Sequence, residues 1–111
     1  MYYSQQEPQM KKFILIVVAL MLVVGEVWAA DGKTVYGKIC HFCHEDGILG
    51  SPMIGNRIEW KERYEKGIEN LYQSAINGIG HMSERKGRRN FNEADIKRAV
   101  DYLLKESGIT E

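Results

Sequence analysis

KICHFCHEDG, residues 38–47, contains both cysteines of the chain. Cys40 and Cys43 are spaced as Cys-x-x-Cys, and His44 directly follows the second thiol. Two thiols and an imidazole this close together are typical of four kinds of site: a disulfide, a zinc site, a redox-active thiol pair or a covalent haem attachment. The rest of the sequence discriminates among them.

The N-terminal segment predicts export. Lys11 and Lys12 precede an unbroken apolar run from Phe13 to Val24, and residues 27–29 resemble a signal peptidase site. We therefore expect residues 1–29 to be a signal peptide and residues 30–111 to form one domain, with Met10 as an alternative start and Ala30 as an alternative cleavage point. A retained membrane anchor is the competing interpretation, but a spanning helix needs about 20 apolar residues.

Charge and length narrow the function classes. The chain carries 15 basic and 15 acidic residues, and this balance does not indicate a nucleic-acid partner or a charged membrane surface. A domain this short commonly needs a disulfide, a metal or a cofactor to reinforce its small core. The sequence therefore predicts one small domain that depends on such a group.

Three of the four interpretations of the cysteines fit poorly. A Cys-x-x-Cys disulfide closes a very small loop and so constrains the unfolded chain little. A thioredoxin-like dithiol requires a βαβ setting that the sequence lacks, and zinc requires four ligands, usually including a second pair at a distance.

Cys-x-x-Cys-His is the signature of covalent haem attachment. Each thiol can add to one vinyl group of the porphyrin, and His44 then reaches the iron. We expect His41 to be an exposed spacer. A metal-bound imidazole donates its other N–H to an acceptor, and a backbone carbonyl near Pro52 is the candidate, although Pro52 could equally be a residue that only stiffens a turn.

The remainder of the sequence predicts an all-α domain of about four short helices. We expect helices from Gly32 to Ile39, from Arg57 to about Lys66 after an Asn56 cap, from Ile68 to Gly78, and from Asn92 to just before Gly108. The last two have apolar stripes at helical spacing. In the third these are Ile68, Leu71, Tyr72, Ala75 and Ile76, and in the fourth Ile96, Ala99, Val100, Leu103 and Leu104.

Met82 and His81 are adjacent candidates for the second iron ligand. Methionine ligation opposite a histidine raises the reduction potential and is typical of electron carriers. Because lone methionines are usually core residues and lone histidines usually lie at the surface, the residues alone favour Met82 only slightly.

The chain from Asp31 to Glu106 resembles a class I c-type cytochrome, specifically the c-five branch of small bacterial carriers. Gly50, Pro52 and Gly55 resemble the Gly-x-Pro-x-x-Gly loop of this family, whose proline carbonyl accepts the histidine N–H. The resemblance continues through the helices and the methionine loop, at Trp60, Arg63, Gly67, Leu71, Ala75, Gly78, Met82, Ala99, Val100 and Tyr102. It implies a cytochrome c-like fold around one haem c attached through Cys40 and Cys43, with His44 and Met82, rather than His81, on the iron.

Two departures concern the methionine loop. Ser83 occupies the position of a family proline, and Lys86, Gly87 and Arg88 replace a Lys-Gly-Gly sequence. These departures indicate a more charged methionine loop.

The resemblance implies a periplasmic one-electron carrier that is not an enzyme. Trp60 and Arg63 are candidates to contact a haem propionate, with Trp60 equally suited to the core. We expect redox proteins as partners, with Arg85, Lys86, Arg88 and Arg89 steering an acidic surface or simply forming a solvated loop, and membrane contact only through partners unless the signal segment is retained. The alternatives are a gas-binding or catalytic haem protein with an open iron position, and the electron-delivering haem subunit of a larger periplasmic oxidoreductase.

Overall fold

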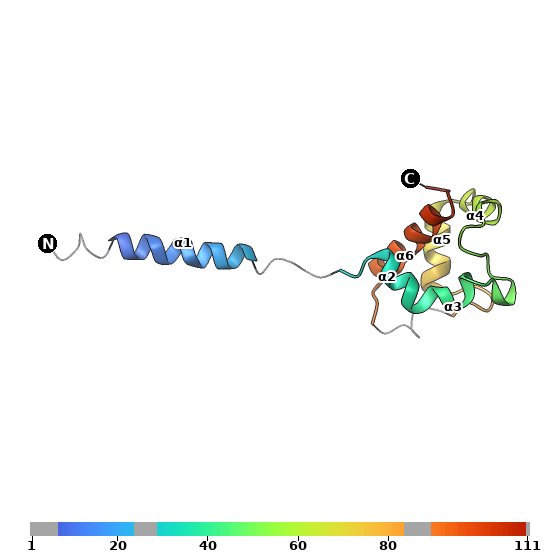
Figure 1. Ribbon diagram of the computed structural model, residues 1–111, viewed down its shortest axis with the longest axis horizontal. Helices are drawn as coiled ribbons and strands as arrows, with labels where there is room; N and C mark the ends of the chain where they lie inside the picture. The colour runs from blue at the N-terminus through green and yellow to red at the C-terminus, as the bar shows by residue number, and fades with distance from the viewer. Residues whose placement is uncertain (1–6, 24–28, 84–89, 111) are drawn as a thin grey trace.

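The computed structural model describes residues 7–23, 29–83 and 90–110. Its first helix, α1 (Glu7–Val23), contains residues 13–23 of the predicted apolar run and stands apart from the helices that follow (Figure 1). Within the described ranges, no helix is long and apolar enough to cross a lipid bilayer.

The helix that contains the cysteines is longer than predicted and has an irregular centre. It begins with α2 (Gly32–Val35), where the Asp31 side chain accepts a hydrogen bond from the Thr34 N–H at 2.7 Å. It continues through a π-helical segment, η1 (Tyr36–Cys40), into α3 (His41–His44). The predicted end at Ile39 is therefore wrong. The wider π-helical turn, in which the His41 N–H bonds to the Tyr36 carbonyl, inserts a residue and hides the helical period of the sequence.

The three remaining long helices begin where the sequence predicts. The cap of α4 (Arg57–Tyr64) is Asn56, and α4 ends two residues before the predicted Lys66, at a turn closed by the Gly67 N–H and the Tyr64 carbonyl. The next helix, α5 (Ile68–Asn77), is followed by Gly78, and α6 (Glu93–Glu106) begins with a reciprocal capping box between Asn92 and Asp95. A short 3₁₀ turn, η2 (Ile48–Gly50), lies in the loop before α4.

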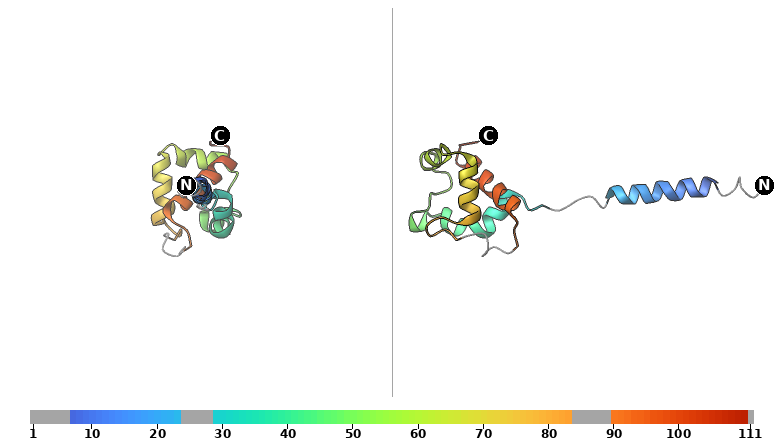
Figure 2. Two further views of the ribbon diagram at one scale, coloured as in Figure 1. Left: turned by 90° about the vertical axis from the view of Figure 1, so that its left-hand side faces the viewer. Right: turned by 180° about the vertical axis from the view of Figure 1, so that it is seen from behind.

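Helix α6 is central to the domain, with α2 and α5 on either side of it (Figure 2). The buried core has two clusters. The Val35 cluster contains Val35, Ala75, Ile76, Ile96 and Ala99, and the Leu104 cluster contains Tyr36, Trp60, Leu71, Leu103 and Leu104. The predicted apolar stripes of α5 and α6 thus face the core, as expected.

The crossing of α2 over α6 requires a glycine. A Cβ atom at Gly32 would lie 2.1 Å from the Arg98 carbonyl oxygen and 2.9 Å from Tyr102 Cβ. The obstructing oxygen belongs to the backbone of α6 and cannot rotate away, so any side chain at Gly32 would push the two helices apart.

We predict that Gly32→Ala lowers the free energy of unfolding by about 1–3 kcal/mol, the usual cost of overpacking. Gly37 is the matched control, because a Cβ there meets nothing within 4 Å. Gly37→Ala should stabilise the chain by roughly 0.5–1 kcal/mol through reduced backbone entropy in the unfolded state. Chemical denaturation of the two variants measures both changes. If Gly32→Ala stabilised the chain as Gly37→Ala is expected to do, the result would contradict the close crossing.

Candidate functional site

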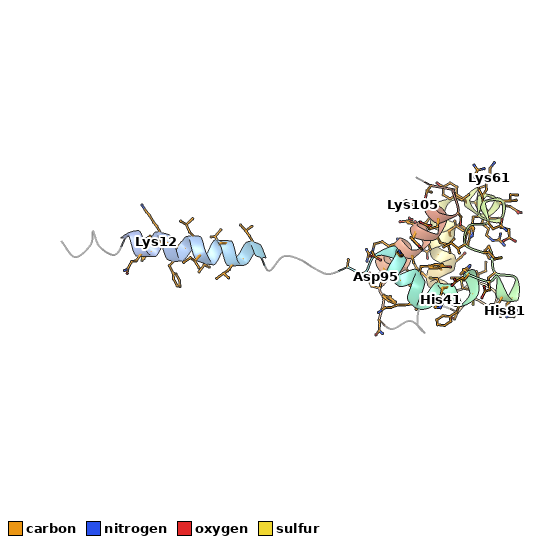
Figure 3. The ribbon with its side chains drawn as sticks, in the orientation of Figure 1. Lys12, His41, Lys61, His81, Asp95 and Lys105 are labelled. Atoms are coloured by element: carbon orange, nitrogen blue, oxygen red, sulfur yellow. The ribbon has the colours of Figure 1, made fainter. Side chains whose placement is uncertain are left out.

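One cavity of about 340 Å³ opens among the helices of the domain. Residues of η1, α3, α4, α5, α6 and the loops around Pro52 and Met82 line it, and most of their lining atoms are apolar. Figure 3 draws the side chains of the domain and labels His41 and His81, neither of which lines the cavity. The lining residues are Cys40, His44, Pro52, Trp60, Arg63, Lys66, Asn70, Leu71, Ser74, Ala75, Ile79, Met82, Ile96, Ala99, Val100 and Leu103. Its volume lies within the range of small-molecule and cofactor pockets, about 300–1,000 Å³.

His44 lies in the wall of this cavity with its orientation fixed. Its side chain is 8% exposed, and its Nδ1 lies 2.8 Å from the carbonyl oxygen of Pro52. Because a carbonyl oxygen can only accept, Nδ1 must carry the proton, and the lone pair of a neutral imidazole then resides on Nε2. The expected hydrogen bond to Pro52 is therefore present, and it leaves Nε2 as the atom that can bind a metal.

Two further hydrogen bonds hold the loop that contains Pro52, at the two residues that follow the proline. The Ile54 N–H donates to the His44 carbonyl at 2.7 Å, and the indole N–H of Trp60 donates to the Met53 carbonyl at 2.8 Å. The Trp60 ring also lies against the imidazole of His44, with a centroid distance of 5.7 Å. Trp60 thus has a defined structural role in orienting His44.

The two cysteines are half-buried on consecutive turns of the same helical segment. Cys40 lines the cavity, whereas Cys43 lies between Cys40 and His44 along the chain and is not a lining residue. In this described segment the two thiols are not joined by a disulfide. The expectation that His41 is exposed is wrong, because its side chain is half-buried; its ring packs at a tilt against Phe42 at a centroid distance of 4.1 Å and takes no part in the cavity wall.

Met82 lines the cavity and His81 does not. A tight turn places Met82 there, because Ile79 and Met82 exchange two backbone hydrogen bonds of 3.2 and 2.9 Å. The Met82 side chain is half-buried against the Val35 cluster, while His81 is exposed. The structure therefore brings Met82 and His44 to the same cavity.

One part of the cavity wall is polar. Arg63 was predicted from the sequence, but Lys66, Asn70 and Ser74 were not. Asn70 and Ser74 lie four residues apart on α5, next to the cavity-lining Leu71 and Ala75, so helical spacing is the signal that could have found these two. Lys66 lies in the turn between α4 and α5, where that spacing does not apply. The Nη1 atom of Arg63 donates to the Glu59 carbonyl at 2.9 Å.

The predicted basic docking residues Arg85, Lys86, Arg88 and Arg89 lie outside the described residues. Their role in docking remains a prediction.

Two tyrosines of the domain, neither of which lines the cavity, have raised pKa values. Burial, together with the nearby Glu45, raises the pKa of Tyr36 to about 12. Its side chain is 7% exposed and packs against Tyr102 at 5.5 Å, and its hydroxyl has no hydrogen-bond partner among the described residues. Burial and a 2.5 Å hydrogen bond to Asp101 likewise raise the pKa of Tyr72 to about 12.

A family model described as "Cytochrome C oxidase, cbb3-type, subunit III" matches residues 28–103. A cytochrome c-555 of Chlorobaculum tepidum is 31% identical over 88% of this chain and 99% of its own length. A cytochrome c5 of Ectopseudomonas mendocina is 30% identical over 68% of this chain and 88% of its own length. The chain is a class I c-type cytochrome of the c5 branch.

Solved structures agree with this assignment. The cytochrome resembles a chain from an electron-transfer complex of nitrite reductase with cytochrome c, with a TM-score of 0.65 and 26% identity over 73% of this chain and 99% of the other. It also resembles reduced cytochrome c551 of Ectothiorhodospira halophila, with a TM-score of 0.58 and 28% identity over 68% of this chain and 99% of the other. The predicted all-helical cytochrome c-like fold and electron-transfer role are confirmed. Membership of the c-type cytochromes also implies covalently bound haem c as the cofactor.

We predict that Tyr36→Phe raises the free energy of unfolding at pH 7 by about 1 kcal/mol, because it removes a buried hydroxyl without a partner. The variant should also lose less stability in alkali. Unfolded tyrosine ionises near pH 10, whereas folded Tyr36 keeps its proton to about pH 12, so the wild-type residue favours unfolding as the pH rises between these values.

Tyr72→Phe is the matched control for this prediction. It removes a hydroxyl that is hydrogen-bonded to Asp101, so it should lower stability at pH 7. Denaturation from pH 7 to 11 compares the two variants, and a loss of stability in Tyr36→Phe at pH 7 would contradict the unpaired hydroxyl.

Proposed function

We propose that this cytochrome is a periplasmic one-electron carrier in which Cys40 and Cys43 attach one haem c, and His44 and Met82 are the two iron ligands. The observation that carries the proposal is the shared cavity. His44 presents Nε2 as its only unprotonated nitrogen, Met82 offers a thioether, and both side chains line the same, mostly apolar cavity. This donor set fits a low-spin haem iron.

The haem, when bound, supplies one-electron exchange between ferric and ferrous iron. Residues of the chain keep the environment of the iron nearly unchanged while an electron is gained or lost. Leu71, Ile96 and Leu103 exclude water from the cavity, and a site from which water is excluded reorganises little when a charge changes. The Pro52 carbonyl keeps the proton on Nδ1 of His44, and with two protein ligands on the iron no position remains for a substrate.

The polar part of the wall suits the acidic groups of the cofactor. We propose that Arg63 and Lys66 are charge partners of the haem propionates and that Asn70 and Ser74 donate hydrogen bonds to them. Trp60 differs from the sequence-based expectation, since its N–H is already donated to the Met53 carbonyl. We propose that Trp60 contributes an apolar wall and an orienting contact to His44, not a propionate hydrogen bond.

Redox proteins are the proposed partners. A similar cytochrome c has been solved in an electron-transfer complex with nitrite reductase, which supports transient docking to an oxidoreductase. Residues 1–29 are the proposed export signal, supported by the lysine pair and the apolar helix α1. Contact with the membrane would then occur only through partners.

The family description favours one second candidate function. Because the matching family model is named for a subunit of a cytochrome oxidase, this chain could be the haem subunit of a larger oxidoreductase. Gel filtration of the native cell extract, with the cytochrome detected by its haem absorption, distinguishes the independent carrier from the oxidoreductase subunit. Elution at the size of the isolated domain supports the independent carrier, and elution only with a large complex supports the subunit.

We predict that Met82→Ala lowers the reduction potential on the order of 0.1 V, within the roughly 0.8 V that axial ligands span. The ferric protein should lose the weak red charge-transfer band of methionine-bound haem, and the ferrous protein should bind carbon monoxide rapidly. His81→Ala is the matched control, because His81 is exposed and does not line the cavity. Loss of the band in His81→Ala would contradict the choice of Met82 over His81 as the iron ligand. Rapid carbon monoxide binding by the wild type would support an open iron position.

The double variant Cys40→Ala with Cys43→Ala should remain largely unfolded. Both core clusters border the cavity, so without the attached cofactor the apolar residues on each side lack a common partner. Far-ultraviolet circular dichroism measures the loss of helix. Native helix content in this variant would contradict the proposed dependence of the fold on haem.

A further inference from the structure

We infer that Ser107 is a positioning residue for His44. The inference rests on the proposed function, because it concerns the histidine that we assign to the iron. Ser107 lies just after α6, far along the chain from His44, and nothing in its local sequence indicates a role at the site.

The Ser107 hydroxyl is buried and makes two hydrogen bonds. The side chain is 2% exposed. Its Oγ donates to the Leu103 carbonyl at 2.7 Å and accepts the backbone N–H of Gly55 at 2.9 Å. Because a hydroxyl carries one proton, the bond to Leu103 fixes the proton on the helix side and leaves a lone pair directed at Gly55.

The end of α6 holds this hydroxyl in place. The Gly108 N–H donates to the Lys105 carbonyl and the Ile109 N–H to the Leu104 carbonyl, each at 3.0 Å. Gly108 has φ +74°, the left-handed conformation that this helix ending requires. Ile109 also packs against the Leu104 cluster. Ser107 is therefore attached to the buried Leu104 cluster.

Gly55 is attached to His44 through a short segment. Only two residues separate it from Pro52, whose carbonyl accepts the Nδ1 proton of His44 at 2.8 Å. Between them, the Ile54 N–H bonds to the His44 carbonyl at 2.7 Å. A displacement of Gly55 must therefore move the Pro52 carbonyl relative to the imidazole. The bond from Ser107 sets where this segment lies.

We expect Ser107→Ala to change the position of the Pro52 segment without leaving a buried polar group unpaired, because both groups that bond to the hydroxyl keep other hydrogen-bond partners. The Leu103 carbonyl still accepts the backbone N–H of residue 107 at 3.0 Å, and Gly55 is exposed to water. A looser segment weakens the bond from His44 Nδ1 to Pro52, which makes the imidazole a poorer donor. A poorer donor stabilises ferric iron less, so the reduction potential should rise.

The experiment uses the haem-loaded protein. In Ser107→Ala, the His44 Nδ1 proton of the ferrous form should exchange with solvent at least about tenfold faster by NMR, since one restraint on its acceptor is lost. The ferrous-to-ferric ratio at a fixed applied potential should rise about threefold, below the 10–100-fold effects of direct partners of metal ligands. Ser107→Thr, which keeps the hydroxyl, should restore both values toward the wild type.

Tyr72→Phe is the matched control, because it also removes one hydroxyl and one side-chain hydrogen bond on α5 and α6, but away from the His44 loop. Unchanged exchange and potential in Ser107→Ala would overturn the inference while leaving the proposed function intact. Equal changes in Tyr72→Phe would also overturn it, since the effect would then report general loss of stability. Absence of a haem spectrum in the wild type would instead overturn the proposed function.

A measurement on the wild type tests the inference without a variant. If Ser107 holds the segment, one opening motion should expose both the Gly55 N–H and the His44 Nδ1 proton to solvent. The protection of these two protons from exchange should then change in parallel with temperature. Much weaker protection of the Gly55 N–H than of the His44 proton would overturn the inference even if Ser107→Ala does not fold.

Discussion

The hydrogen bond from His44 Nδ1 to the Pro52 carbonyl is the interaction on which the site depends. It selects one tautomer of the imidazole and so decides which nitrogen faces the cavity. It also requires the chain after α3 to turn back on itself, and the glycines at positions 47, 50 and 55, all at positive φ, allow that turn. The Trp60 indole, through the Met53 carbonyl, and the Ser107 hydroxyl, through the Gly55 N–H, then hold the returning segment.

The core of the domain is divided by the site. Ala75, Ile96 and Ala99 of the Val35 cluster, and Trp60, Leu71 and Leu103 of the Leu104 cluster, all line the same cavity. Burial of apolar surface is the main favourable term in folding. A group that fills the cavity therefore joins two small cores into one, and binding and folding stabilise each other.

Local signals in the sequence predicted most of the fold. Asn56 and Asn92 are caps because each side chain bonds to a backbone N–H three residues later, and the stripes of α5 and α6 follow from helical spacing. The Cys40–His44 motif likewise indicated its chemistry directly. Long-range features were not predictable in this way. The bond between Gly55 and Ser107 joins residues 52 positions apart, and the π-helical turn at Tyr36–Cys40 breaks the period on which the prediction relied.

The crossing of Gly32 over the Arg98 carbonyl has a consequence for folding. The two residues lie near opposite ends of the domain's sequence, and among the described helices α2 makes its most extensive contacts with α6. During folding, α2 therefore lacks its main packing partner until the distant segment that forms α6 has come together with it. The thiols of Cys40 and Cys43, which follow α2 in the same helical segment, therefore stay accessible until this late long-range contact forms.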